Sequence, residues 1–410
     1  MGAVPIESNP AKITNDLPTR GSNATALKAY NERVMLSLIR AYGSLSKAEI
    51  ARITGLSSKT CSVIMKELER GGLILRREPQ RGKVGQPLVP FSLSPDGALS
   101  IGFKFGRRSA DLVLVDFLGS VRHVVRSTYA YPEPRQLETF VRSGVEDVTR
   151  SLSAAQRTRI CGLGIAAPFE MWSWEAEVGA PAHVLEAWRS YDIAREVRLM
   201  VPWPVHFCKD ATAACAAELS FGSHSQHPDF FYVFIATLIG GGVVLNGSLY
   251  PGRTGYAGSF GSVLVPDPSG KGTAQRLIRC ASIYLLEDML RESGRDVSVL
   301  NNADDWSEIG SVLDQWIEQV SESLSMAIGS AIAILDFQAI VIDGEFPPAV
   351  RARIVQRTKE KMTGVEQEGV APVEIVEGVV GRDARVRGAA LLPLIAGFER
   401  DRNLLLVNER

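Results

Sequence analysis

Cysteines and long apolar runs are scarce in this chain. Only 5 of its 410 residues are cysteine, and no two of them form a Cys-x-x-Cys pair. A disulfide-stapled extracellular domain is therefore excluded, and a reducing, cytoplasmic setting is expected. The two most apolar stretches, residues 230–245 and 326–342, are interrupted and fall short of the about 20 apolar residues that span a bilayer. Because the first 20 residues also lack the apolar core of a signal peptide, we expect a soluble cytoplasmic protein without a membrane partner.

Net charge is small, at −1, but it is unevenly distributed. Residues 27–90 contain twelve Lys or Arg, five Glu and no Asp, which gives +7 and leaves −8 for the rest of the chain. A compact basic segment beside an acidic body suits a DNA partner, because contacts between cations and phosphates supply much of the affinity for DNA. A basic surface that is merely solvated would have the same composition, so charge alone does not decide between the two.

Local patterns over residues 25–95 predict a winged helix-turn-helix domain after a flexible tail at residues 1–24. Apolar residues recur at helical spacing over residues 27–39, and the run stops at Gly43. Ser46 and Glu49 form a capping box that opens a short second helix. A third helix and two strands complete the pattern, at residues 57–72, 73–78 and 88–93.

The third predicted helix has a face suited to the major groove of DNA. Its apolar side is centred on Cys61 and Leu68, so at about 100° per residue the opposite side is polar and cationic. Such side chains near the start of a helix can reach base edges. The predicted DNA-binding residues lie on this helix and on or beside the wing: Ser58, Lys59, Thr60, Ser62, Val63, Lys66, Arg76, Arg77, Arg81 and Lys83. The alternative, a winged helix that binds another protein, stays open.

From about residue 99 the pattern becomes α/β. Three strands, a helix and a fourth strand are expected at residues 100–105, 111–116, 121–126, 135–151 and 160–166. The alternation recurs with a strand, a tight turn, a return strand, a long helix and another strand, at residues 231–236, 240–242, 243–245, 305–335 and 339–342. A strand–turn–strand opening in each half predicts two related lobes.

These motifs, in this order, resemble the ROK family (repressors, open reading frames, kinases). Residues 115–119 resemble the family's first hairpin, residues 162–168 its Gly-Ile-Gly-x-x-x-Pro strand, and residues 239–247 its Ile-Gly-Gly-Gly motif. The resemblance runs from about residue 27 to a C-terminal helix near residues 385–396. It implies an actin/hexokinase-like body over residues 96–410, and homodimers or tetramers. The expected lobes are residues 96–210 with the helix 384–398, and residues 211–383.

The chain departs from the family's kinases where those hold ATP. Their Asp-x-Gly-Gly-Thr stretch reads Lys-Phe-Gly-Arg-Arg at residues 104–108, and their Gly-Thr-Gly turn reads Ala-Thr-Leu at residues 236–238. These changes remove both a carboxylate near Mg²⁺ and the glycines whose backbone approaches the phosphates. The loss of both argues against phosphoryl transfer. We therefore predict no catalytic residue, no enzymatic activity and no cofactor.

The family's zinc signature is also missing. Its histidine reads Ser262, and residues 263–278 contain no cysteine. Cys280 stands alone and is expected to be a small buried apolar residue rather than a ligand. No structural zinc or other metal is predicted.

The sugar site implied by the resemblance is largely rewritten. The family's Asn-Asp pair, whose aspartate acts as general base, reads Lys209-Asp210, and a sugar-binding glutamate reads Ser259. Asp210 is expected to contact a ligand or to cap the helix that follows it, and the two roles are compatible. His183 lies where the family has a substrate-side loop. Trp172, Trp174 and Trp188 flank it and would either stack on a ring or pack in the core. The predicted effector-binding residues are Asp210, His183, Lys209 and Ser259.

Together these patterns predict a DNA-binding transcriptional regulator, a repressor, with a degenerate kinase body for dimerisation and effector sensing. A symmetric dimer would bind a palindromic operator in double-stranded DNA. The expected small-molecule effector, with a carbohydrate as the candidate, would bind near Asp210. Two alternatives are an active sugar kinase with an accessory DNA-binding domain and a protein-interaction module without affinity for DNA.

Overall fold

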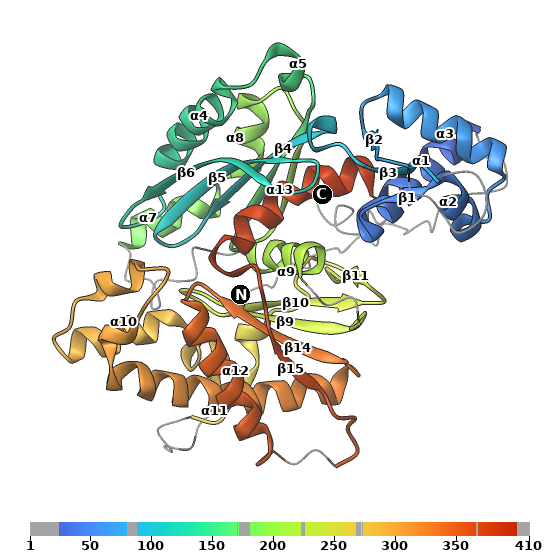
Figure 1. Ribbon diagram of the computed structural model, residues 1–410. Helices are drawn as coiled ribbons and strands as arrows, with labels where there is room; N and C mark the ends of the chain where they lie inside the picture. Colours follow the sequence, from blue (N-terminus) through green and yellow to red (C-terminus); the bar gives the residue numbers. More distant parts are fainter. Residues whose placement is uncertain are drawn as a thin grey trace, which may run out of the picture.

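The computed structural model describes residues 24–79, 88–169, 171, 181–222, 226–267, 272, 274–365 and 368–399. Along the chain these residues form a small winged-helix unit and then two α/β lobes, each built on a five-stranded sheet (Figure 1). The predicted fold class is confirmed. The domain boundaries stay predictions.

The winged-helix unit packs three helices on an antiparallel sheet with strand order β1–β3–β2. The predicted capping box is confirmed: the Ser46 side chain accepts from the Glu49 amide, and the Glu49 side chain accepts from the Ser46 amide. Ser57 caps the third helix by accepting from the Thr60 amide, as predicted. The sequence does not reveal β1, because two residues are too few to show a strand period. The elements are α1 (Ala24–Tyr42), β1 (Leu45–Ser46), α2 (Lys47–Thr54), α3 (Ser58–Arg70), β2 (Ile74–Arg76) and β3 (Pro90–Leu93).

Lobe one has a sheet of order β6–β5–β4–β7–β8, with antiparallel pairs from β6 to β4 and parallel pairs from β4 to β8. Alternate residues of β5 enter different cores: Leu112 and Leu114 belong to the core that includes α4, and Val113 and Val115 to the core that includes α13. The elements are β4 (Leu99–Phe105), β5 (Ser109–Asp116), β6 (Val121–Thr128), α4 (Pro134–Arg150), α5 (Ala154–Arg157), β7 (Ile160–Ala167), α7 (Ala182–Glu186), α8 (Ile193–Met200) and β8 (Val205–Lys209).

Lobe two has a sheet of order β11–β10–β9–β14–β15. Its face toward lobe one is covered by α9, and its far face by α10, α11 and α12 (Figure 1). The elements are α9 (Asp210–Phe221), β9 (Phe230–Ile235), β10 (Gly240–Leu245), β11 (Ser248–Leu249), β12 (Leu264–Val265), β13 (Gln275–Arg276), α10 (Ile283–Glu292), α11 (Ser311–Ile334), β14 (Ala339–Gly344), α12 (Pro348–Met362) and β15 (Glu374–Glu377). The last helix, α13 (Ala384–Phe398), follows lobe two in the chain but packs on the sheet of lobe one.

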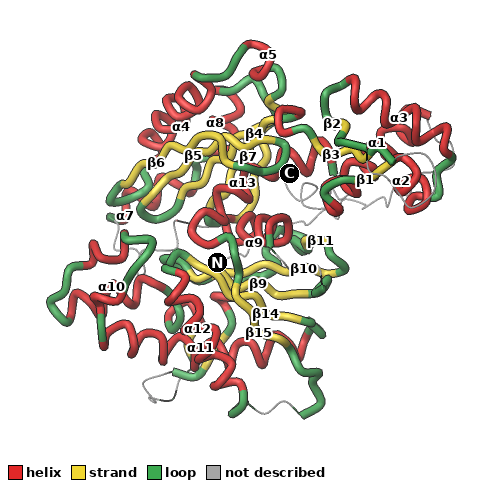
Figure 2. Tube along the Cα trace, in the orientation of Figure 1, coloured by secondary structure: helices red, strands yellow, loops and turns green. Residues whose placement is uncertain are grey.

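The helices α9 and α13 lie together between the two sheets (Figure 2). Glycines make this close packing possible. A Cβ added at Gly164 in β7 would lie 1.8 Å from the Ala389 carbonyl oxygen of α13. A Cβ at Gly388 in α13 would lie 1.8 Å from the Ala213 carbonyl oxygen of α9. The Gly-x-Gly pattern of residues 162–164 thus reflects contact between a strand and a helix.

Two sequence predictions for lobe two are wrong. Residues 240–242 are not a tight turn but the start of β10, where Gly240 pairs with Phe234 of β9. Glycine is needed there because α9 packs on the strand: a Cβ at Gly242 would lie 2.4 Å from the Cys215 Cβ. The helix expected over residues 305–335 begins only at Ser311, because Gly310 (φ +60°) separates it from a short 3₁₀ turn.

Candidate nucleic-acid interface and ligand cleft

The exposed side of α3 is polar and cationic. Cys61, Ile64, Met65 and Leu68 are buried against the rest of the unit, as their spacing predicts. The predicted DNA-binding residues of this helix lie on the other side: Ser58, Lys59, Ser62, Val63 and Lys66 are exposed, and Thr60 is half-buried. Within the described part of the chain, the ammonium groups of Lys59 and Lys66 have no hydrogen bond or ion pair. Both charges are therefore available to a ligand outside the protein.

The two arginines beside the wing are exposed but engaged within the unit. Arg76 donates to Glu69, with an Nη2–Oε2 distance of 3.0 Å, and its guanidinium lies 5.8 Å from the centre of the Phe91 ring. Arg77 donates from Nε to the Ser92 hydroxyl at 2.7 Å. A phosphate would have to compete with Glu69 for Arg76. The other two predicted wing residues, Arg81 and Lys83, lie outside the described residues.

Two adjacent cavities occupy the cleft between the lobes. The larger, of about 410 Å³, is lined by the turn between β4 and β5, by α10 and by the start of α13. The smaller, of about 190 Å³, is lined by residues around the end of β8 and the segment that follows β11. Pro168, Asp210 and Leu238 line both. Asp210 thus stands at the junction of the two cavities.

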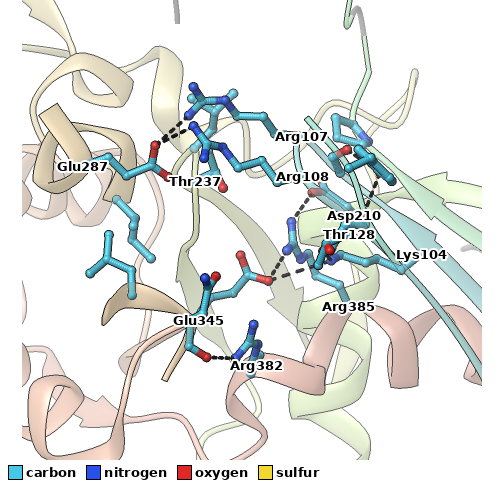
Figure 3. A pocket seen from close by; sticks show the side chains of 18 of the residues that line it. Lys104, Arg107, Arg108, Thr128, Asp210, Thr237, Glu287, Glu345, Arg382 and Arg385 are labelled. Atoms are coloured by element: carbon cyan, nitrogen blue, oxygen red, sulfur yellow. Dashed lines mark hydrogen bonds and ion pairs between the residues drawn. The ribbon is translucent and has the colours of Figure 1, made fainter. Parts of the chain in front are cut away.

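An ion-pair network that joins the lobes crosses the larger cavity (Figure 3). Arg385 of α13 donates to Asp210 at 3.1 Å and also to Glu345, which follows β14. The Nζ atom of Lys104 in β4 lies 3.9 Å from Glu345 Oε1 and donates to Asp111 Oδ2 at 3.0 Å. Burial opposes the charge of Arg385, but Glu345 and Asp210 outweigh burial and raise the pKa of the guanidinium. The retained aspartate is therefore already paired with a cation.

Asp210 also has a local role. It is the first residue of α9, and the N-cap is Lys209, whose side chain makes no cap bond. One Asp210 carboxylate oxygen accepts from the Ala211 amide at 2.8 Å, while the other accepts from Arg385. The prediction that Asp210 caps this helix is therefore wrong, because the helix already begins at Asp210 and, of the helix amides, its carboxylate accepts only from the next one. The carboxylate also lines both cavities, so a contact with a ligand stays a prediction.

Changing Glu345 to Gln is expected to destabilise the protein by about 3 kcal/mol at pH 7, because two cations then lose a buried counter-charge. Burial raises the pKa of Glu345, but Arg385 and Lys104 together outweigh burial and hold the pKa below its ordinary value. Such a carboxylate stabilises the fold above its unfolded pKa of about 4.3, and this contribution is lost as pH falls through the folded pKa. The difference between wild type and variant should therefore shrink at pH 3.5.

Urea unfolding at pH 7 and at pH 3.5 measures the difference in the free energy of unfolding between wild type and variant. The matched change is Glu186→Gln, which removes an exposed carboxylate paired with Arg189 and should alter stability by less than about 0.5 kcal/mol. If Glu345→Gln lowered the free energy of unfolding equally at both pH values, the charge of Glu345 would not be what stabilises the fold.

A second contact between the lobes is made by the turn between β4 and β5. Arg107 and Arg108 approach the same oxygen of Glu287 on α10, at 3.4 and 3.0 Å (Figure 3). Arg291 lies 3.0 Å from that oxygen. Burial lowers the pKa of Arg107, and Glu287 opposes this shift. The sequence did not identify Glu287, Glu345 or Arg385, and no local signal marks them.

The start of α13 is fixed by two buried carboxylates of lobe two. Glu218 of α9 accepts from the amides of Val379 and Val380, at 3.1 and 3.3 Å. Asp343 of β14 accepts from the Gly381 amide at 2.8 Å. These bonds hold the loop that carries α13 into the cleft, and so position Arg385.

Three of the four predicted effector residues line the smaller cavity. Lys209 donates to the Ser259 hydroxyl at 3.0 Å, and Ser259 in turn donates to the Tyr256 carbonyl at 2.7 Å. Burial lowers the pKa of Lys209, and Asp210 opposes this shift. Phe169 packs edge-to-face on Tyr256, with ring centres 5.2 Å apart, and supplies an aromatic wall that the sequence reading missed.

The fourth predicted effector residue, His183, is not brought to this group. It is exposed on α7 and is not among the residues that line either cavity. Trp188 is a core residue: it is 4% exposed, stacks on Phe105 and donates from its indole nitrogen to the Pro132 carbonyl. Trp172 and Trp174 lie outside the described residues.

Within the described ranges, no group of three or more His, Cys, Asp or Glu is arranged to hold a metal ion. Cys280 is buried, and burial raises the pKa of its thiol. Of the helices that the structure describes, none combines the length and the apolar character needed to cross a membrane.

Comparison with known proteins gives matches to two family models. The model described as "ROK family" matches residues 100–394, and one described as "Winged helix-turn-helix DNA-binding" matches residues 30–74. Among solved structures, a ROK family transcriptional regulator described as a homologue of the Escherichia coli MLC protein superposes with a TM-score of 0.67 at 21% identity. The superposition covers 93% of this chain and 98% of that one, and shows the same fold.

Two curated relatives cover much of the chain. The xylose repressor of Bacillus subtilis (strain 168) is 23% identical over 274 residues, which are 66% of this chain and 70% of the relative. The DNA-binding transcriptional dual regulator NagC of Escherichia coli (strain K12) is 23% identical over 349 residues, which are 80% of this chain and 83% of the relative. Neither name describes a kinase.

Proposed function

The chain belongs to the ROK family, as a transcriptional regulator with an N-terminal winged helix-turn-helix, and on that premise we propose that it is a cytoplasmic repressor. It binds double-stranded DNA through α3. The observation that carries this proposal is the exposed face of α3, with two lysines that no described group engages. Selection of duplexes from a randomised library by the purified chain tests it. If no duplex is enriched, the protein-interaction alternative takes its place.

In this proposal the chain acts as a homodimer or tetramer. Two copies of α3 related by two-fold symmetry would read the two halves of a palindromic operator. Lys59, Ser62 and Lys66 would contact bases or phosphates. Arg76 and Arg77, at the base of the wing, would lie near the DNA backbone.

Kinase activity is the second candidate function, since the fold is shared with the family's kinases. The cleft does not favour it. A general base has to accept a proton from the substrate hydroxyl, and Asp210 already accepts from Arg385. Lys104 puts a cation where the kinases place a carboxylate, which opposes Mg²⁺ binding. We therefore propose that the protein transfers no phosphoryl group. Coupled ADP release over a panel of hexoses with Mg-ATP tests this, and any turnover lost in Asp210→Asn would overturn it.

We also propose that the smaller cavity binds a neutral polyhydroxylated effector, a carbohydrate. Lys209, Ser259 and Asp210 offer donors and acceptors for hydroxyl groups, and Phe169 and Tyr256 offer apolar ring surfaces. The name of the Bacillus relative, a xylose repressor, supports this class of ligand. An effector that binds one arrangement of the lobes better would change DNA affinity by about 5- to 150-fold.

A thermal-shift screen with pentoses, hexoses and amino sugars is expected to yield at least one sugar that raises the melting temperature. The shift should be reduced by more than half in Ser259→Ala and in Lys209→Met, because each removes a polar group from the cavity. Lys359→Met, an exposed change on α12, serves as the matched control and should keep the full shift. A shift that persists in both cavity variants would place the effector elsewhere.

A further inference from the structure

An arginine of lobe one contacts the end of α3. Arg159, which directly precedes β7, donates from Nη1 to the Gly71 carbonyl at 2.6 Å. Gly71 is the C-cap of α3, where backbone carbonyls lack partners within the helix. A cation is favoured at this end because the helix dipole makes it partly negative. The guanidinium thus connects the body to the helix that carries Lys59 and Lys66.

Two glycines leave space for the contact between Arg159 and the end of α3. Gly72 has a φ of +74°, and a Cβ added there would lie 3.1 Å from Arg159 Nη2. Gly97 lies just before β4, and a Cβ there would lie 2.9 Å from the Gly72 carbonyl oxygen. The turn after α3 is therefore in close contact with both the linker and the arginine.

Arg159 is itself fixed within lobe one. Its amide donates to the Gln156 carbonyl at 2.9 Å, and its carbonyl accepts from the Leu99 amide, at the start of β4, at 2.8 Å. The residue thus bridges β7 and the point where the chain leaves the winged-helix unit.

A second anchor lies where α1 meets α13, close to the turn after α3 (Figure 1). Arg40 of α1 lies 3.3 Å from Glu399 and 5.1 Å from the centre of the Phe117 ring. Phe117 in turn packs edge-to-face on Phe398 of α13, with ring centres 4.8 Å apart. The winged-helix unit is therefore held on the body through α1 as well as through the end of α3.

We propose that Arg159 is a positioning residue for DNA recognition: it fixes the direction of α3 relative to lobe one and so sets the spacing of half-sites that the protein accepts. This rests on the proposed function, because spacing matters only to an oligomer that reads two half-sites. Arg159 contacts no DNA in this scheme. Its loss leaves the affinity for one half-site intact and relaxes the discrimination between spacings.

The test uses the full chain and the duplex obtained by selection, together with duplexes that carry two, five or ten additional base pairs between the half-sites. Five base pairs turn one half-site to about the opposite face of the DNA. Wild type is expected to bind the five-base-pair insertion at least about tenfold more weakly than the selected duplex. In Arg159→Gln this ratio should fall to about threefold or less, with unchanged affinity for a single half-site. Arg159→Lys should restore part of the discrimination.

Arg157→Gln is the matched control, because Arg157 is a nearby exposed arginine that donates to the Leu152 carbonyl within lobe one. It should keep the wild-type ratio. Gly72→Ala is a second variant with the same expected direction of change, since its methyl group would crowd Arg159 Nη2 at 3.1 Å and strain a turn with a φ of +74°. An unchanged spacing ratio in Arg159→Gln and Gly72→Ala would overturn the proposal. A selected duplex that contains only one half-site would also overturn the proposal about spacing, but it would leave the proposed DNA binding unaffected. Enrichment of no duplex would instead count against the proposed function.

Discussion

Changing both Lys59 and Lys66 to glutamate is expected to weaken binding to the selected duplex by about 100-fold or more. Both side chains are exposed on the free face of α3, and no described group competes for their charges. The double change removes two cations from the predicted interface and adds two anions that repel phosphate. If both lysines contact phosphates, the slope of log affinity against log salt should become less steep by about two. Fluorescence anisotropy at several salt concentrations measures the affinity and the slope together.

The control for this experiment is a variant with the same change in net charge elsewhere. The double variant Arg142→Glu, Lys359→Glu makes the same change in net charge at exposed positions of α4 and α12. We expect its affinity to stay within about threefold of wild type, since distant surface charges are screened. Equal losses in the two double variants would mean that total charge, rather than α3, governs binding.

Changing Gly164 to Ala is expected to destabilise the fold by about 3 kcal/mol or more. The new methyl group would lie 1.8 Å from the Ala389 carbonyl oxygen and 2.8 Å from its carbon. Both are backbone atoms of α13, so no side-chain rotation relieves the overlap, and β7 and α13 have to separate. Urea unfolding followed by circular dichroism gives the free energy, and the same loss would appear as a lower yield of folded protein.

Gly397→Ala provides the comparison on the same helix. A Cβ at Gly397 meets nothing within 4 Å, and alanine is the better helix former. We therefore expect this variant to be as stable as wild type or more stable by up to about 1 kcal/mol. Comparable losses in the two variants would show that α13 does not pack on lobe one as described.

What the sequence predicts well is local. The capping box of α2, the cap of α3 by Ser57 and the burial of Cys61 and Leu68 all follow from neighbours within a few residues. The same holds for β4, β5, β6 and β7, whose ends are predicted to within two residues. For this reason the sequence alone predicts which face of α3 is exposed, although the contact of this face with DNA stays a prediction.

What the sequence does not reveal depends on residues brought together from far apart. Arg107 and Glu287 are separated by 180 residues, so the partner of the turn between β4 and β5 has no local signature. Glycines are ambiguous for a related reason. Residues 240–242 resemble a turn, yet glycine is required there by the approach of α9 to β10. His183 was placed by family resemblance alone, and its exposed position on α7 depends on how lobe one packs.

The most direct test of the whole account is the salt dependence of binding between the purified chain of 410 residues and its selected duplex. We predict specific binding whose affinity falls steeply and linearly on a log–log scale between 50 and 300 mM salt, because phosphate contacts by the winged-helix unit release counterions. Affinity that is independent of salt, or equal for the selected and an unrelated duplex, would contradict it.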